Sequence, residues 1–91
     1  MLNDIKTALR ISRATTAFDG EITDLINAAK ADLQITGVKV DDEADSLIKR
    51  AITTYVKAHF GWDNPDAEKL QQSYNMLKMH LSLSMEYGAS S

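Results

Sequence analysis

The sequence predicts an all-α protein, a small bundle of about four helices that ends in a long C-terminal αα-hairpin. Four segments repeat apolar residues every three or four positions, which is the spacing of one helix face. The only tryptophan and the only proline lie together within 60–66, between the two longest segments. The apolar stretch 38–40 is too short to build a sheet. We expect one helical domain, residues 1–87, followed by a short flexible tail, 88–91.

The first half of the chain predicts two helices joined by a loop. The first helix covers about 3–11 and carries charges that agree with the helix dipole at both ends. The loop covers 12–18, where no periodicity is visible. The second helix begins with Asp19 as its N-cap and stops before Gly37. Its core stripe consists of Ile22, Leu25, Ile26, Ala29 and Leu33.

A third helix is expected from about Glu43 to Phe60. Its apolar face is broad, which indicates a central helix that contacts several others. The acidic run at 41–45 has two interpretations. One is a cation site, although the glycine and the ligand alternation of a calcium loop are absent. The other, which we favour, is a helix N-terminus, where the helix dipole stabilises carboxylates.

The joint after the third helix is the predicted corner of the hairpin. Gly61 suits the left-handed backbone that follows a helix end. Pro65 fits a first helical turn, where its missing N–H has no partner to lose, and Asn64 can cap that turn. Trp62 has two interpretations. It either fills the bottom of the hairpin, which we favour, or forms an exposed aromatic anchor for a partner.

The fourth helix is expected from about Pro65 to Tyr87. Its first half is amphipathic, but from Met76 onward apolar side chains point around most of the circumference. A terminal helix of so small a protein cannot bury all of them within one subunit, which indicates burial between subunits or against a partner. Methionine suits such an adaptable surface. The predicted interface residues are Met76, Met79, Leu83, Met85 and Tyr87.

The residue types that enzymes and metal sites need are sparse. No cysteine is present, which excludes thiol catalysis and cysteine metal sites. Neither His59 nor His80 has a second histidine four residues away, or a carboxylate within one turn of its helix. No glycine-rich phosphate loop occurs. We therefore expect a non-enzymatic protein with no catalytic residue, metal site or cofactor, and with no signal peptide or membrane span.

A small helical DNA-binding or regulatory protein is the alternative class. Four helices in so short a chain fit a helix-turn-helix domain, with recognition residues Lys49, Arg50 and Lys57, or Arg10 and Arg13. The first set shares its helix with the broad apolar face, so we expect most of that helix to be core. The net charge of −3 also argues against a protein dedicated to the phosphate backbone.

Ordinary residues in a definite order support a family resemblance over essentially the whole chain. The pattern is Leu-x-x-Ile-Lys-x-x-Leu-Arg-Ile at 2–11, then Glu-Ile-x-x-Leu-Ile-x-Ala-Ala-Lys-x-x-Leu at 21–33. Its most specific part is 55–84, which includes Phe-Gly-x-Asp-Asn-Pro-Asp-Ala-Glu at 60–68. The chain resembles the head–tail connector (adaptor, or head-completion) proteins of long-tailed bacteriophages and of related prophages of Gram-positive bacteria.

The resemblance implies a structural virion protein without enzymatic activity. Such subunits form a ring of about twelve copies beneath the portal protein at the head–tail junction. The ring extends the DNA channel, lets DNA pass without sequence-specific binding, and gives stopper or tail-completion proteins an attachment surface. The resemblance also implies assembly in the cytoplasm of the bacterial host. Arg10 and Arg13 are candidate contacts at the ring's rim, and an exposed Trp62 would join the interface.

Overall fold

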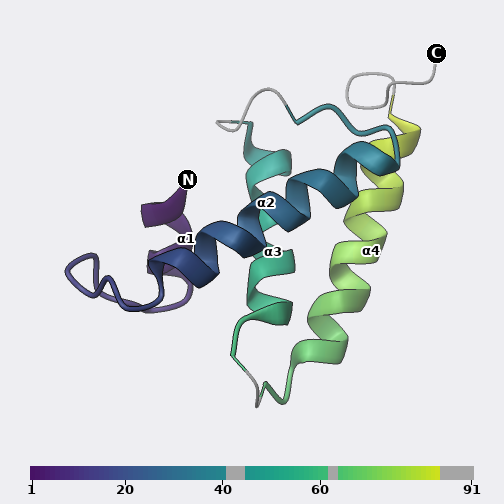
Figure 1. The fold of residues 1–91 in the computed structure, drawn as a ribbon. Helices are drawn as coiled ribbons and strands as arrows, with labels where there is room; N and C mark the ends of the chain where they lie inside the picture. The colour runs from purple at the N-terminus through teal and green to yellow at the C-terminus, as the bar shows by residue number, and fades with distance from the viewer. Residues whose placement is uncertain (41–44, 62–63, 85–91) are drawn as a thin grey trace.

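The computed structural model describes residues 1–40, 45–61 and 64–84, and within them it contains helices and no β-strand. The helices are α1 (Leu2–Ala8), α2 (Asp19–Ile35), α3 (Ser46–His59) and α4 (Ala67–Leu83). Helices α3 and α4 run side by side in opposite directions, and α2 crosses them on one side (Figure 1). The predicted all-α bundle of four helices is therefore confirmed. The long C-terminal hairpin stays a prediction, because residues 62–63 at its corner and 85–87 at its end lie outside the described residues.

Helix α3 lies at the centre of the packing, as its broad apolar face predicts. It contacts α1, α2 and α4. The buried core draws residues from all four helices and from the short segment after α2. Its fully buried apolar side chains include Ile5, Ile22, Leu33, Ile48, Ile52, Val56, Tyr74 and Leu81. Complete burial of one aliphatic side chain of this size stabilises a fold by roughly 1.5–3 kcal/mol, so these residues carry most of the hydrophobic stabilisation.

Helix α2 ends at the predicted glycine. Gly37 has a φ of 89°, in the left-handed region that a side chain disfavours. Its N–H donates to the Gln34 carbonyl, and the next N–H, of Val38, reaches back to the Leu33 carbonyl over 2.9 Å. This pair of hydrogen bonds is the Schellman motif, which satisfies carbonyls that the helix leaves without partners.

Helix α1 ends at Ala8, three residues before the predicted end, and it ends with the same motif. Arg10 occupies the left-handed position, with a φ of 62°, and its N–H donates to the Thr7 carbonyl. The N–H of Ile11 reaches back to the Lys6 carbonyl over 2.8 Å. An arginine in this conformation gives no signal in the sequence, because glycine normally occupies it.

A buried lysine connects α1 to the loop that follows it. The side chain of Lys6 is only 1% exposed, and its ammonium donates to the carbonyls of Arg13 and Thr15. The same ammonium lies 2.8 Å from Oδ1 of Asp19. The prediction that Asp19 caps α2 is therefore wrong: Phe18 is the N-cap, without a side-chain hydrogen bond, and the carboxylate faces Lys6 instead.

Helix α3 begins with an acidic cap. Oδ1 of Asp45 accepts hydrogen bonds from the N–H groups of Leu47 and Ile48, which places the start of the helix later than the predicted Glu43. This contact supports the interpretation of Asp45 as a helix-terminal carboxylate. The rest of the acidic run, 41–44, lies outside the described residues.

The corner after α3 follows the prediction at Gly61 but not at Asn64. Gly61 has a φ of 78°, as expected past a helix end. The side chain of Asn64 donates to the Lys57 carbonyl of α3 and accepts from the Asp66 N–H, so it ties the corner to α3 instead of capping α4. Helix α4 begins only at Ala67, with Asp66 as its N-cap.

The positions of the other two corner residues follow from this late start. Pro65 precedes the N-cap of α4, so the prediction that it lies in the first helical turn is wrong. The ring still fixes the backbone just before the helix. Trp62 lies outside the described residues, and both of its interpretations stay open.

Candidate assembly surfaces

Helix α4 has one buried face and one exposed apolar row. Tyr74 and Leu81 are fully buried against the core. Met76, Met79 and Leu83 are 72%, 63% and 79% exposed, and we call these three residues the α4 row. They lie three and four positions apart and extend about 10 Å along one helix face. The other two predicted interface residues, Met85 and Tyr87, lie outside the described residues.

A polar contact between α2 and α4 holds the buried face in place. The hydroxyl of Tyr74 donates to Oδ2 of Asp32 over 2.6 Å, and the ammonium of Lys78 lies 3.0 Å from the same oxygen. The Tyr74 ring packs edge-on against Tyr55 of α3, with ring centroids 5.0 Å apart. One tyrosine therefore contacts both α2 and α3 and fixes which side of α4 faces solvent.

The ionisation of this pair follows from its contacts. Partial burial acts to raise the pKa of Asp32, but the hydrogen bonds from Tyr74 and Lys78 outweigh it and lower the pKa below its ordinary value of 3.8. Burial, together with the hydrogen bond to the Asp32 carboxylate, raises the pKa of Tyr74. At neutral pH the pair is a neutral phenol bound to a carboxylate. Sequence reasoning placed Tyr74 inward but missed Asp32, which lies 42 positions away.

The two predicted rim residues lie far along the chain from the α4 row and on the other side of α3. Arg10 and Arg13 are exposed, and they lie at the end of α1 and in the following loop. Figure 1 shows this loop projecting beside α1, with α3 between it and α4. The structure therefore presents two separate candidate surfaces.

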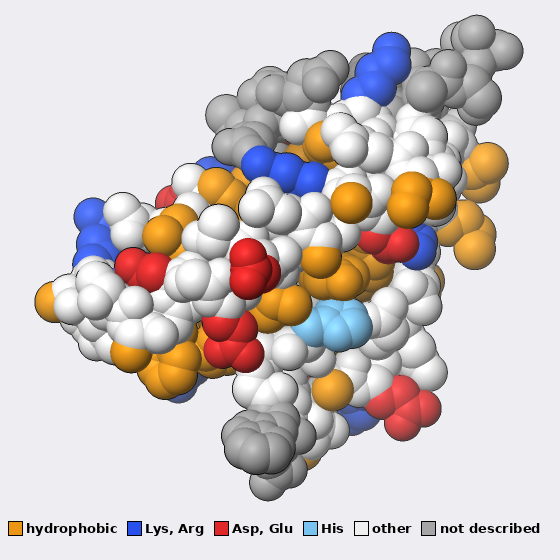
Figure 2. Space-filling model, viewed as in Figure 1, with side chains coloured by type: hydrophobic (Ala, Val, Ile, Leu, Met, Phe, Trp, Pro, Cys, Tyr) orange, Lys and Arg blue, Asp and Glu red, His pale blue; other side chains and the backbone are white. Residues whose placement is uncertain are grey.

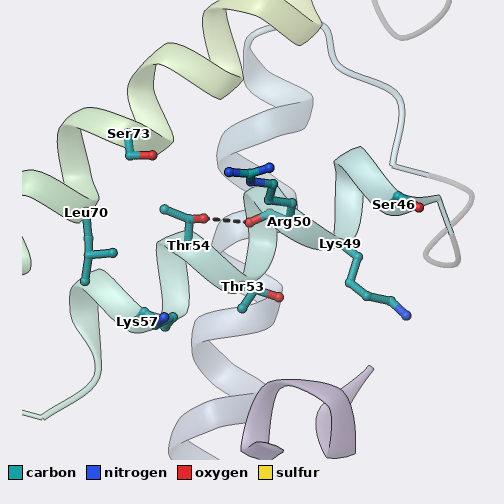
Figure 3. Close-up of a pocket in the computed structure, with 8 residues that line it drawn as sticks. All are labelled: Ser46, Lys49, Arg50, Thr53, Thr54, Lys57, Leu70 and Ser73. Carbon is teal, nitrogen blue, oxygen red and sulfur yellow. Dashed lines mark hydrogen bonds between the residues drawn. The ribbon is translucent and has the colours of Figure 1, made fainter. Parts of the chain in front are cut away.

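A groove between α3 and α4 is a feature that the sequence patterns did not predict. It measures about 520 Å³, and Figure 3 shows the residues that line it. They are Ser46, Lys49, Arg50, Thr53, Thr54, Lys57, Leu70 and Ser73. The expectation that most of α3 is core holds for its apolar face, but its three cations line this groove. None of the eight residues that line it in the described part of the chain is acidic.

The groove continues toward the α4 row. A second hollow of about 330 Å³ shares Arg50 and Ser73 with the first, and it is also lined by Met76, Leu77 and His80. The basic groove and the first residue of the α4 row therefore belong to one continuous surface along α3 and α4.

The described residues contain no group of three or more His, Cys, Asp or Glu side chains placed to hold a metal ion. Nε2 of His59 lies 2.8 Å from the amide oxygen of Gln71, a contact that links α3 to α4. None of the helices in residues 1–40, 45–61 and 64–84 has the length and apolar character needed to cross a bilayer.

Comparison of the sequence with protein-family models shows the family of this helical protein. A family model described as phage connector protein matches residues 1–88, nearly the whole chain. The chain belongs to the phage connector protein family. No curated protein and no solved structure matches this connector significantly.

Family membership gives the candidate surfaces a context. A connector is a structural component of the virion at the junction of head and tail, and the family is not a class of enzymes. Its role requires contact with other head and tail proteins. The exposed residues of this connector are therefore where its function is to be sought.

Proposed function

We propose that this connector forms a ring, of about twelve copies when assembled, beneath the portal protein of a bacteriophage capsid. The ring extends the DNA channel and provides the attachment surface for stopper or tail-completion proteins, and it assembles in the cytoplasm of the bacterial host. DNA passes through it without sequence-specific binding. The family match over residues 1–88 is the observation that carries the proposal.

The α4 row supports a protein contact at this helix. Three long apolar side chains, each more than half exposed, lie on one face of a helix whose opposite face is buried. Their burial in an assembly would remove apolar area from water, which is the main favourable term in association. We assign this row to a contact with a neighbouring subunit or the portal, and we propose Met85 and Tyr87 as further interface residues.

The rim contact is proposed at Arg10 and Arg13. Both are exposed, and Arg10 keeps a left-handed backbone at a position where glycine would fit better. A substitution to glycine would relieve this backbone strain, so the presence of arginine supports a role for its side chain in a contact. We also propose Trp62, which follows Gly61 in the sequence, as an interface residue.

The portal contact can be tested with two substitutions in the α4 row. Met79→Asp and Leu83→Asp place charges at exposed positions, so we expect helical content and unfolding temperature to stay nearly unchanged. Binding to purified portal, measured by pull-down and electron microscopy, should be lost because the contact would bury a charge. Asn3→Asp, at an exposed position of α1 and away from α4, is the control for an added carboxylate and should bind as wild type.

Two results would contradict this assignment. If both row variants unfold the protein, these side chains belong to its core. If wild-type protein neither binds portal nor forms rings with it at any concentration, the connector-ring proposal itself is wrong. A monomer in the absence of portal does not contradict the ring proposal, because rings can form on the capsid.

The basic groove favours one second candidate, a protein that binds DNA. Lys49, Arg50 and Lys57 face one groove that also offers hydroxyl groups, and such groups contact phosphates. A salt-dependent shift of duplex DNA by micromolar protein would support this candidate. The absence of any shift at low salt would remove it.

A further inference from the structure

The groove between α3 and α4 is a basic surface on an acidic protein. Arg50 and Lys57 are exposed, and neither makes an ion pair within the described residues. Lys49 is already paired, because its ammonium lies 3.5 Å from Asp4 of α1. Arg50 and Lys57 therefore carry the uncompensated charge, and they lie about 10 Å apart along the axis of α3.

An acidic surface lies on α2. Glu21 and Asp24 are exposed and three positions apart, so they are neighbours on the helix surface. Figure 2, which looks onto α2, shows acidic side chains over the N-terminal half of this helix. Ala28 and Ala31 continue the exposed face toward the C-terminus and add little bulk. This face combines negative charge with a profile low enough for another element to approach closely.

The two surfaces lie on opposite sides of the molecule. Helix α2 packs across one side of α3. Figure 3 looks onto the other side, where the residues of the groove lie in front of α3 and α2 passes behind it. One copy can therefore present its groove to one neighbour and its α2 face to another without using any residue twice.

We infer that the α3–α4 groove of one copy receives the N-terminal half of α2 from the next copy, with Glu21 and Asp24 lying between Arg50 and Lys57. This inference rests on the proposed ring, since it names the subunit contact from which the ring is built. The two carboxylates lie about 5 Å apart along α2, so they fit between two cations with twice that separation. The flexible arms of Arg50 and Lys57 reach inward to meet them.

The same contact explains how copies repeat. It joins two different surfaces, so every copy keeps one free groove and one free α2 face for further copies. Such a heterologous contact closes into a ring when its rotation allows. The hydroxyl groups of the groove, from Ser46, Thr53, Thr54 and Ser73, supply additional polar partners for the incoming helix.

Charge reversal on either side tests the pairing. The groove variant carries Arg50→Glu and Lys57→Glu, and the helix variant carries Glu21→Lys and Asp24→Lys. Sedimentation of each protein at low salt should show self-association at least about tenfold weaker than for wild type, because like charges then face each other. Mixing the two variants should restore association, because each contact again joins opposite charges.

A variant with all four substitutions should associate with itself. The matched control for the groove variant is Lys39→Glu with Lys69→Glu, which makes the same change of charge at exposed positions outside the groove. It should associate as wild type does. Raising the salt from about 0.05 M to about 0.5 M should weaken wild-type association, because salt screens exposed charges. Unchanged melting curves for all variants would show that the folds are intact.

The inference is overturned if mixing the two variants restores no association, either in solution or as rings on purified portal, or if the groove variant alone forms rings on portal as wild type does. Portal binding by wild type, measured by pull-down beside these experiments, would leave the proposed ring intact, so that such a result rejects only this contact. A third result also rejects it. If duplex DNA binds wild type and not the groove variant while self-association is absent, the groove is a nucleic-acid site.

Discussion

The helices on the two sides of α3 are held in place by different kinds of contact. On one side, a helix of seven residues and its loop depend on a buried cation, Lys6, with three oxygen partners. On the other side, a helix of seventeen residues packs through Tyr74 and Leu81. Helix α1 is too short to be stable by itself and buries few apolar residues, so polar contacts fix its position.

This difference shows which part of the fold keeps an exposed apolar surface for partner proteins. The Lys6 contacts turn polar groups inward and fix the loop, whereas α4 is secured along one face and leaves its apolar row outside. Substitution of Lys6, which holds α1 and its loop, should therefore affect stability most. Substitutions in the α4 row should affect binding and leave the fold nearly unchanged.

The largest expected effect is that of Lys6→Met. Methionine fills a similar volume but leaves the Asp19 carboxylate and the carbonyls of Arg13 and Thr15 without their donor. Removing one partner of a buried ion pair costs about 3 kcal/mol or more. We expect the free energy of unfolding, from urea titration at neutral pH, to fall by about 3 kcal/mol, since Asp19 keeps some access to solvent.

Lys69→Met is the control, since Lys69 is exposed on α4. It should change the free energy of unfolding by less than about 0.5 kcal/mol. A loss for Lys6→Met no larger than that of the control would mean that the buried ammonium contributes nothing net. The α1 side would then be held by Ile5 and its apolar neighbours alone.

A smaller effect is expected for Tyr74→Phe on the other side of α3. The ring can keep its packing against Tyr55, and only the hydroxyl that donates to Asp32 is lost. Hydrogen bonds to charged groups contribute about 1.5–3 kcal/mol, and Lys78 stays as a partner of Asp32, so we expect a loss of about 1.5 kcal/mol. A loss equal to that of Lys6→Met would contradict the difference between the two sides.

The pH dependence of the same contact checks its cause. Because the pKa of Asp32 is lowered in the folded protein, its carboxylate contributes stability above the unfolded value of 3.8. That contribution is lost as the pH falls through the lowered folded value. The stability difference between wild type and Tyr74→Phe should therefore narrow in acid. A difference that stays constant down to acid pH would show that Asp32 is not responsible.

The periodic parts of the fold were predictable from sequence, and the contacts between them were not. Apolar spacing predicted four helices and the central place of α3, and two glycines marked where helices stop. Lysine is normally exposed, so no pattern places Lys6 in the interior. The partners Asp32 and Tyr74 lie on different helices, and only the packing brings them together. The groove was not predicted because the broad apolar face of α3 suggested that most of this helix is core, whereas Arg50 and Lys57 lie on its other face.

The smallest predicted effects concern the ends of α1 and α2. Arg10→Gly is the only substitution expected to stabilise the protein. Both helices end in a Schellman motif, with Arg10 at the left-handed position in one and Gly37 in the other. Arg10→Gly should raise the free energy of unfolding by about 0.5–1 kcal/mol, because glycine adopts this backbone without a Cβ penalty. Gly37→Ala should lower it by about 1 kcal/mol for the converse reason.

Portal binding turns this comparison into a test of function. If Arg10 is retained for the rim contact, Arg10→Gly should give a more stable protein that binds portal more weakly. Arg13→Gly removes the same charge at a position without a left-handed backbone, so it separates the loss of charge from the relief of strain. A more stable Arg10→Gly protein with unchanged portal binding would remove Arg10 from the proposed rim, because its strained backbone would then serve no contact there.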